Sequence, residues 1–257
     1  MTTIDLNCDV GESFGAWRLG ADDALLPWVS SVNIACGFHA GDPAVMRRTV
    51  RAALDHELAL GAHPGLPDLA GFGRRALAIS PDEAYALVLY QVGALLGFAL
   101  VAGSRLAHVK PHGALYNMAA HDRALADAIA AAVYDLDRSL ALYGLAGSEL
   151  VRAAERAGLA AAPEAFADRN YEGSGALASR ARTDALVTDP AAAAARVLRM
   201  VREGRVTSLD GREVALAPRT ICIHGDGPTA PALARAVRET LEGAGIEVSA
   251  AAVRAHG

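Results

Sequence analysis

The sequence is almost without lysine. Of its 24 lysine and arginine residues only Lys110 is a lysine, and the formal net charge is −5. The chain has no basic block, whereas proteins that bind nucleic acids carry a positive surface that replaces phosphate counterions. We therefore expect no nucleic-acid partner.

Cysteine is also scarce. Cys8, Cys36 and Cys222 are far apart and odd in number, which argues against a disulfide framework and against a clustered zinc site. We expect these three residues to be small buried side chains at strand ends.

Signals for secretion and for membrane insertion are lacking too. The first residues, MTTIDLNCDVGE, do not combine a basic segment with an apolar one, as a secretion signal would. Arg, Asp and Glu are expected to break the alanine-rich stretches before these reach the roughly 18 apolar residues of a membrane helix. The sequence thus predicts a cytoplasmic protein without a membrane partner.

Several catalytic motifs are absent. The sequence contains no G-x-x-x-x-G-K-[ST], H-E-x-x-H or C-x-x-C pattern. This excludes the P-loop of a Walker-type ATPase and leaves a zincin or a ribbon zinc site without support. One Asp and two or three His from separate strands could still form a metal site with oxygen and nitrogen ligands.

The length and the order of apolar segments indicate an α/β fold. The chain has 257 residues, and α/β barrels of about 250 residues form one domain, so we expect a single (β/α)-barrel domain over residues 1–257. Short apolar runs alternate with amphipathic ones, which is typical of βα repeats. The predicted strands lie near 3–8, 32–36, 58–62, 106–110, 139–145, 159–163, 219–224 and 246–252.

Local signals place helices between these strands. Asp42-Pro43, Ser80-Pro81 with Glu83, and Asp189-Pro190 are typical helix starts. Residues 206–216, with Asp210-Gly211 at their centre, predict a β-hairpin. Seven to eight parallel strands would form a TIM-like barrel, complete or irregular, with an open doubly wound sheet as the alternative.

Polar residues gather where the predicted strands end. The candidate site residues in these clusters are Asn7, Asp9, Glu12, Asn33, His39, His63, Arg74, Lys110, His112, Asn117, His224 and Asp226. The C-terminal strand ends of a barrel meet at one rim, which is where catalytic groups are found. Taken singly, Asp9 or Asp42 could cap a helix, and one histidine is more often structural. Their recurrence at strand after strand favours a shared site.

Lys110 is the sharpest individual case. An apolar strand is a costly place for a charge, so this side chain must reach the rim, pair with a carboxylate or shift its pKa. Arginine serves everywhere else in this sequence as the cation, which suggests that the site requires a compact ammonium group.

The clusters resemble a known family. Residues 5–12, 33–42, 61–75 and 108–117, together with 164–171 and 223–226, are similar to the LamB/YcsF family of 5-oxoprolinase A subunits, in collinear order over about residues 4–227. Leu66, where an aromatic residue is expected, and the loop 173–177 depart from the family pattern. The resemblance implies a barrel related to polysaccharide deacetylases. It also implies an activity that opens 5-oxoproline to L-glutamate, with ATP as co-substrate and subunits B and C as partners.

This resemblance leads to a hypothesis for the site. Such chemistry requires cations for phosphate and carboxylate groups, and a base for water. The residues assigned to catalysis are Asp9, His39, His63, Lys110, His112 and Asp226, with Asp9 or Asp226 as the general base. Those assigned to substrate or anion binding are Asn7, Glu12, Asn33, Arg74, Asn117 and His224, and Lys110 shares in anion binding.

Two alternatives stay open. The first is a metal-dependent amidase or deacetylase in which Asp9, His39 and His63 bind a divalent ion that activates water. The second is a lactam-binding subunit whose partners carry out all the chemistry. The sequence also leaves open whether the chain forms a homo-oligomer.

Overall fold

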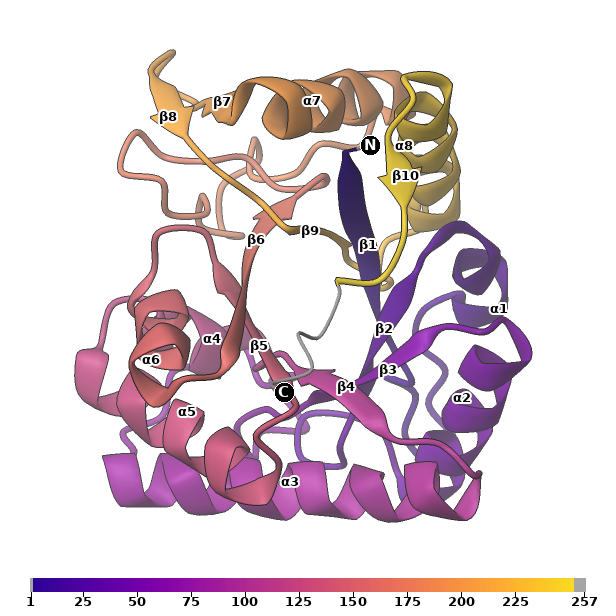
Figure 1. Ribbon diagram of the computed structural model, residues 1–257, viewed down its shortest axis with the longest axis vertical. Coiled ribbons are helices and arrows are strands. Elements are labelled where there is room, and N and C mark those ends of the chain that lie inside the picture. The colour runs from indigo at the N-terminus through magenta and orange to yellow at the C-terminus, as the bar shows by residue number, and fades with distance from the viewer. Residues whose placement is uncertain (1, 252–257) are drawn as a thin grey trace.

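The computed structural model describes residues 2–251, and within them seven parallel strands close into a barrel. These strands are β1 (Thr3–Val10), β2 (Ser31–Ala35), β3 (Ala59–His63), β4 (Leu106–Val109), β5 (Ala141–Leu145), β6 (Ala160–Phe166) and β9 (Thr220–Ile223). Because β1 pairs with both β2 and β9, the ring is complete (Figure 1). The predicted TIM-like barrel is confirmed, and an open doubly wound sheet is excluded.

Three further short strands are not members of the closed ring. β10 (Glu247–Val248) pairs with Thr3 and Ile4 of β1; the strand predicted over 246–252 is therefore shorter than expected, and residue 252 lies outside the described residues. β7 (Arg205–Thr207) and β8 (Glu213–Ala215) form the predicted antiparallel hairpin. The hairpin lies outside the barrel beside α7 (Figure 1).

Helices surround the ring of strands (Figure 1). They are α1 (Asp22–Leu25), the 3-10 helix η1 (Leu26–Trp28), α2 (Pro43–Asp55), α3 (Pro81–Val101), α4 (Gly113–Ala119), α5 (Arg123–Leu136), α6 (Glu149–Ala157), α7 (Pro190–Glu203) and α8 (Ala230–Gly243). The predicted helix starts are confirmed. The side chains of Asp42 and Asp189 accept hydrogen bonds from backbone N–H groups of α2 and α7, and Ser80 forms a capping box with Glu83.

The interior of the barrel is polar. Side chains alternate along a strand, and Asp5, Asn7 and Asp9 of β1 all reach residues on strands across the barrel. In the lowest layer, Asp5 accepts hydrogen bonds from Ser31 and Tyr143, and burial raises its pKa. Most TIM barrels fill this space with branched apolar residues, so the polar layers here lead directly up to the rim.

Helix α3 is unusually apolar. Residues 84–104 contain no charged side chain, so the expectation that Arg, Asp and Glu interrupt every long apolar stretch was wrong. By length and composition α3 could cross a membrane, and a third of its most apolar window is buried. It packs against α5 and β3 on the outside of the barrel. A helix that covers a barrel passes the same test of length and composition.

Candidate active site

A polar pocket of about 360 Å³ opens at the C-terminal ends of the strands. Seven of the predicted site residues line it: Asp9, His63, Arg74, Lys110, His112, Asn117 and His224. Residues from strands that are far apart in the sequence therefore meet at one rim, as predicted from the barrel topology. The remaining five lie behind this lining or beside it.

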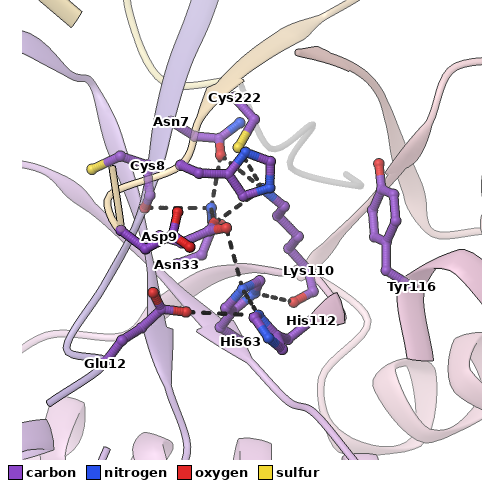
Figure 2. A network of polar contacts seen from close by, with 12 residues as sticks. Asn7, Cys8, Asp9, Glu12, Asn33, His63, Lys110, His112, Tyr116 and Cys222 are labelled. Carbon is purple, nitrogen blue, oxygen red and sulfur yellow. Dashed lines mark hydrogen bonds and ion pairs between the residues drawn. The ribbon is translucent and has the colours of Figure 1, made fainter. Parts of the chain in front are cut away.

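Lys110 follows β4 and is almost completely buried, with 2% of its surface exposed. Its Nζ lies 3.0 Å from Asp9 Oδ1 and 3.0 Å from Glu164 Oε1, and it donates to Cys222 Sγ at 2.9 Å. The ammonium group is thus paired with two carboxylates, one from β1 and one from β6, as Figure 2 shows for Asp9. Pairing with a carboxylate was one of the outcomes expected for this lysine.

The charges of this pair stabilise each other. Burial opposes the charged form of Lys110, but the carboxylates of Asp9 and Glu164 raise its pKa well above the ordinary value. Burial likewise works against an ionised Asp9, yet His63 and Lys110 hold the pKa of Asp9 well below its usual range. At neutral pH the pocket therefore contains a permanent ammonium group in contact with an ionised carboxylate.

Two asparagines hold this pair in place. Asn33 Nδ2 donates to Asp9 Oδ1 at 2.8 Å and to Asn7 Oδ1 at 2.7 Å, and Asn7 Nδ2 donates to Glu164 Oε1 at 3.0 Å. His108 Nε2 in turn donates to Asn33 Oδ1 at 2.7 Å. Because Asn7 and Asn33 are fully buried and do not line the pocket, the structure places them where they can orient Asp9 and Lys110.

Three histidines and a glutamate form a second group. The ring of His39 stacks on that of His112 with 3.7 Å between centroids, and His63 meets both edge-on. Glu12 Oε1 lies 3.4 Å from His39 Nε2 and 3.7 Å from His112 Nδ1. Each of these four residues could supply one ligand atom to a metal ion, and these atoms lie within 4.8 Å of one another. His63 Nε2 also lies 3.4 Å from Asp9 Oδ2. The structure therefore keeps His63 beside Asp9, as the metal-dependent alternative expected, and adds Glu12 and His112 as neighbours of His39 and His63.

A glycine allows the rings to pack this closely. Gly73 has a φ of +61°, and a Cβ at this position would lie 2.7 Å from His39 Cβ and 2.9 Å from His112 Cδ2. Glycine is therefore required here both by the backbone conformation and by the close approach of the rings.

Two further polar contacts are made by residues that directly follow β9. His224 Nδ1 lies 2.8 Å from Asp168 Oδ2, and its ring stacks on Phe166. Asp226 forms an ion pair with Arg74; burial raises the pKa of Asp226, but Arg74 more than compensates, so the pKa is lowered overall. Asp226 and His39 do not line the pocket.

Several residues of the pocket were not among the predicted site residues. Tyr116, Arg169 and Arg180 line it, and Glu164 lies directly behind it as a partner of Lys110 and Tyr116. Cys222 is buried near the end of β9, as expected, and its sulfur in addition accepts a hydrogen bond from Lys110. All three cysteines are buried and free, which confirms that the chain has no disulfide framework.

Residues 11–15 spell G-x-S-x-G, the pattern of a nucleophile elbow. In the structure, Ser13 Oγ accepts a hydrogen bond from Leu19 N at 3.1 Å and approaches Leu19 O at 3.4 Å. The hydrogen bonds of the described residues include none between Ser13 and a histidine. The segment is a loop that leads to the short helix α1, so the pattern carries no hydrolase triad.

Comparison with known proteins identifies the family. The sequence model of the LamB/YcsF family matches residues 4–256. The chain belongs to the LamB/YcsF family. One relative, which is named as the A subunit of 5-oxoprolinase and comes from Bordetella pertussis, is 62% identical over 248 residues, which are 96% of this chain and 98% of the relative. The resemblance of the strand-end clusters is confirmed over nearly the whole length.

Solved structures of related proteins agree with this assignment. The crystal structure of a lactam utilization protein from Thermus thermophilus has a TM-score of 0.91 and 53% identity, and covers 97% of this chain and 100% of that protein. A family 4 carbohydrate esterase from Streptomyces lividans has a TM-score of 0.50 at 12% identity, with 99% and 95% covered. This second similarity confirms the relation to deacetylase-type barrels at the level of the fold alone.

Proposed function

We propose that this LamB/YcsF protein is the A subunit of a 5-oxoprolinase and that its pocket binds the lactam substrate or a phosphorylated form of it. The observation that carries the proposal is the charge of the pocket. Its lining contains four cationic side chains, Arg74, Lys110, Arg169 and Arg180. Lys110 is paired with Asp9 and Glu164, and Arg74 with Asp226, which leaves the guanidinium groups of Arg169 and Arg180 for a bound anion. Guanidinium groups in a small pocket favour anions, and 5-oxoproline carries a carboxylate.

The chemistry of a lactam explains why the pocket would need more than one cationic side chain. An unstrained amide is a poor electrophile, but transfer of the γ-phosphoryl group of ATP to its carbonyl oxygen gives a far better one. Water then adds to the carbonyl carbon, the ring C–N bond breaks, and the nitrogen takes up a proton. A second water releases phosphate from the resulting acyl phosphate, which leaves glutamate. The phosphorylated species carries more negative charge than the lactam, as a pocket rich in arginine would favour.

The residues of this chain can be assigned to parts of that reaction. Arg74, Arg169 and Arg180 would bind the carboxylate and phosphate oxygens. Lys110 would stabilise negative charge that develops at the former carbonyl oxygen. Of the two predicted bases, Asp9 lines the pocket and Asp226 does not, so we assign the proton of the attacking water to Asp9, with His63 and His112 orienting that water.

ATP, the B and C subunits and a cytoplasmic location belong to the same proposal. The chain has no P-loop, so the nucleotide would be bound and used by the assembly as a whole. The test is a glutamate-release assay with 5-oxoproline, in which this chain and the two partner subunits are omitted in turn. We expect release only when ATP and all three subunits are present. Release that is unchanged without this chain would contradict the proposal.

A metal-dependent amidase is the second candidate, and the group of Glu12, His39, His63 and His112 favours it. Such an enzyme would hydrolyse an amide without ATP and would lose activity when a chelator removes the metal. The same assay separates the two candidates, since ATP dependence is the primary readout. A purely lactam-binding subunit would still bind 5-oxoproline after Asp9→Asn, and turnover in the complex would be unchanged.

A further inference from the structure

The outer side of α3 is apolar and open to solvent. The helix lies along the lower edge of the molecule (Figure 1). Its exposed apolar residues share one side, because steps of three and four residues return to the same side of a helix. We call this surface the α3 face, and it consists of Ala86, Tyr90, Gly93, Gly97, Leu100 and Val101. Tyr90, Leu100 and Val101 are 65%, 61% and 91% exposed. Single exposed apolar side chains are common, but a contiguous apolar patch marks an interaction surface.

A groove borders the second half of the α3 face. It has a volume of about 360 Å³ and lies between α2 and α3. Val50, Phe98 and Val101 give it an apolar lining, and Arg47 and Arg51 of α2 also line it. Both arginines are exposed. The groove therefore offers a partner an apolar floor and two cationic side chains.

Charges of opposite sign mark the two ends of this surface. Asp82 and Glu83 are exposed in the first turn of α3, whereas Arg47 and Arg51 lie beside its second half. Between Glu83 and Arg105 the sequence contains no charged residue. A matching partner has an apolar middle and the same charges in reverse order, and a second copy of α3 that lies antiparallel has this pattern. An anionic lipid surface would attract the arginines but repel the two carboxylates.

We infer that the α3 face is the interface of a homodimer, in which two copies of α3 pack antiparallel about a two-fold axis at Tyr90. Such an interface is isologous, so every contact occurs twice. The ring of Tyr90 packs against Phe38 with 5.4 Å between centroids, and its exposed side would meet the Tyr90 ring of the other copy. Gly93 and Gly97 have no side chain, which lets the two helices approach to about 8–10 Å.

An axis at Tyr90 also brings the opposite charges together. Residue 83 of one copy then faces Gly97 of the other, and Gly97 lines the groove. The two carboxylates at the start of each α3 therefore lie beside Arg47 and Arg51 of the other copy. The residues that line the active-site pocket lie outside α3, so dimer formation does not depend on the proposed lactam reaction.

Sedimentation velocity of the full chain, over a range of micromolar concentrations, measures the association. We expect a reversible dimer. Tyr90→Arg should weaken it at least about a hundredfold, because this change places two like charges at the axis. Trp17→Arg is the matched control: Trp17 is also 65% exposed and also packs against a phenylalanine, Phe14, but it lies outside the α3 face. It should leave the association unchanged, and thermal unfolding verifies that both variants fold.

Reversal of the charges tests the antiparallel arrangement. Arg47→Glu/Arg51→Glu should weaken the dimer about tenfold, since exposed ion pairs contribute little singly but occur twice here. Addition of Asp82→Arg to this variant should restore part of the loss.

A cross-link tests the position of the axis. Tyr90→Cys should form an interchain disulfide on mild oxidation, because residues at a two-fold axis lie within the reach of such a bond. Trp17→Cys should not form one.

Four outcomes would overturn the inference. The first is an unaltered chain that stays monomeric throughout, and the second is equal association of Tyr90→Arg and Trp17→Arg. The third is a charge-reversed variant that Asp82→Arg weakens further. The fourth is a monomer that sediments with vesicles of phosphatidylcholine and phosphatidylglycerol, or that binds the B or C subunit, and loses this binding in Tyr90→Arg, because the α3 face would then serve a membrane or another subunit.

Discussion

Lys110 Nζ lies 3.0 Å from Glu164 Oε1, and neither side chain is more than 2% exposed. The two residues come from β6 and the end of β4, and the ion pair crosses the interior of the barrel. Lys110 also donates to Asp9 at the rim of the pocket, and Glu164 accepts a hydrogen bond from Asn7 in the layer below. The pair therefore links the rim of the pocket to that layer. Its main consequence is that Lys110, to which we assign a role in the proposed reaction, also supports the fold.

The first prediction concerns stability. Lys110→Met leaves Asp9 and Glu164 buried without their cation, and breaking a buried pair in this way costs about 3–5 kcal/mol of the free energy of unfolding. Lys110→Met/Glu164→Gln should recover part of this loss, since one unpaired carboxylate is removed. Chemical denaturation measures both variants. Arg123→Met is the control: its pair with Asp127 is exposed and should contribute less than about 1 kcal/mol. Equal stability of the single and double Lys110 variants would contradict this account.

The second prediction concerns the substrate. Arg180 lines the pocket and its guanidinium lies 4.0 Å from Asp226, so it is not committed to a close ion pair there. A hydrogen bond to a charged group contributes about 1.5–3 kcal/mol, and Arg180→Met should therefore raise KM for 5-oxoproline about ten- to hundredfold in the assembled enzyme. Steady-state kinetics measures this change.

The matched control for Arg180 lies two residues away. Arg182 belongs to the same loop, but its guanidinium pairs with Asp184 and it does not line the pocket. Arg182→Met should leave KM unchanged. If both variants raise KM equally, the effect comes from the loop and not from an anion contact.

The sequence predicts the rim well because its signals are local. Helix caps such as Asp42 and Ser80 and the strand-end clusters are each contained within a few residues, and barrel topology then brings the strand ends together. Every second residue of a strand points to the same face of the sheet. Glu164, Phe166 and Asp168 have this spacing along β6 and the residues that follow it. This pattern could have identified Glu164 as facing the interior.

Other features have no local signal. Arg180 lies in a long loop between β6 and α7, and no periodicity indicates that this loop folds over the pocket. The grouping of His63 with His112 and Glu12 depends on ring orientations that are set by the backbone oxygens of Lys110, which contacts His63, and of Phe72, which contacts His112. Such choices among neighbouring polar residues are made by tertiary packing, so the sequence identified the candidates without identifying their partners.

The third prediction tests the close packing of the barrel interior. A Cβ at Gly61 of β3 would overlap the buried ring of His108. Gly61→Ala should lower the free energy of unfolding by at least about 2 kcal/mol, because overpacking of a core costs about 1–3 kcal/mol and the hydrogen bond from His108 to Asn33 would also be disturbed. Thermal and chemical denaturation measure the loss.

A glycine in an open position provides the comparison. Gly93 is exposed on α3, and a Cβ there meets no atom within 4 Å. Gly93→Ala should stabilise the protein by about 0.5–1 kcal/mol, since alanine is the better helix former. A loss of stability in both variants would show that the His108 contact is not the cause.

The fourth prediction concerns pH. Burial lowers the pKa of His108 to about 3, from an ordinary value of about 6.5 in the unfolded chain. Below pH 6.5 the unfolded state therefore binds a proton that the folded state does not. This group's contribution to stability is fully present above pH 6.5 and is lost as the pH falls toward 3. One such proton changes the free energy of unfolding by about 1.4 kcal/mol per pH unit.

The slope of stability against pH isolates this proton. His108→Gln keeps an N–H donor for Asn33 and removes the titrating ring, so between pH 6 and pH 5 its free energy of unfolding should fall less steeply than that of the unaltered protein, by up to about 1.4 kcal/mol per pH unit. His56→Gln, at an exposed position, should leave the slope unchanged. Denaturant titrations at each pH, with a chelator present throughout, give the comparison. Identical slopes for His108→Gln and the unaltered protein would mean that His108 takes up its proton in the folded state, which its burial against Asn33 and Tyr143 argues against.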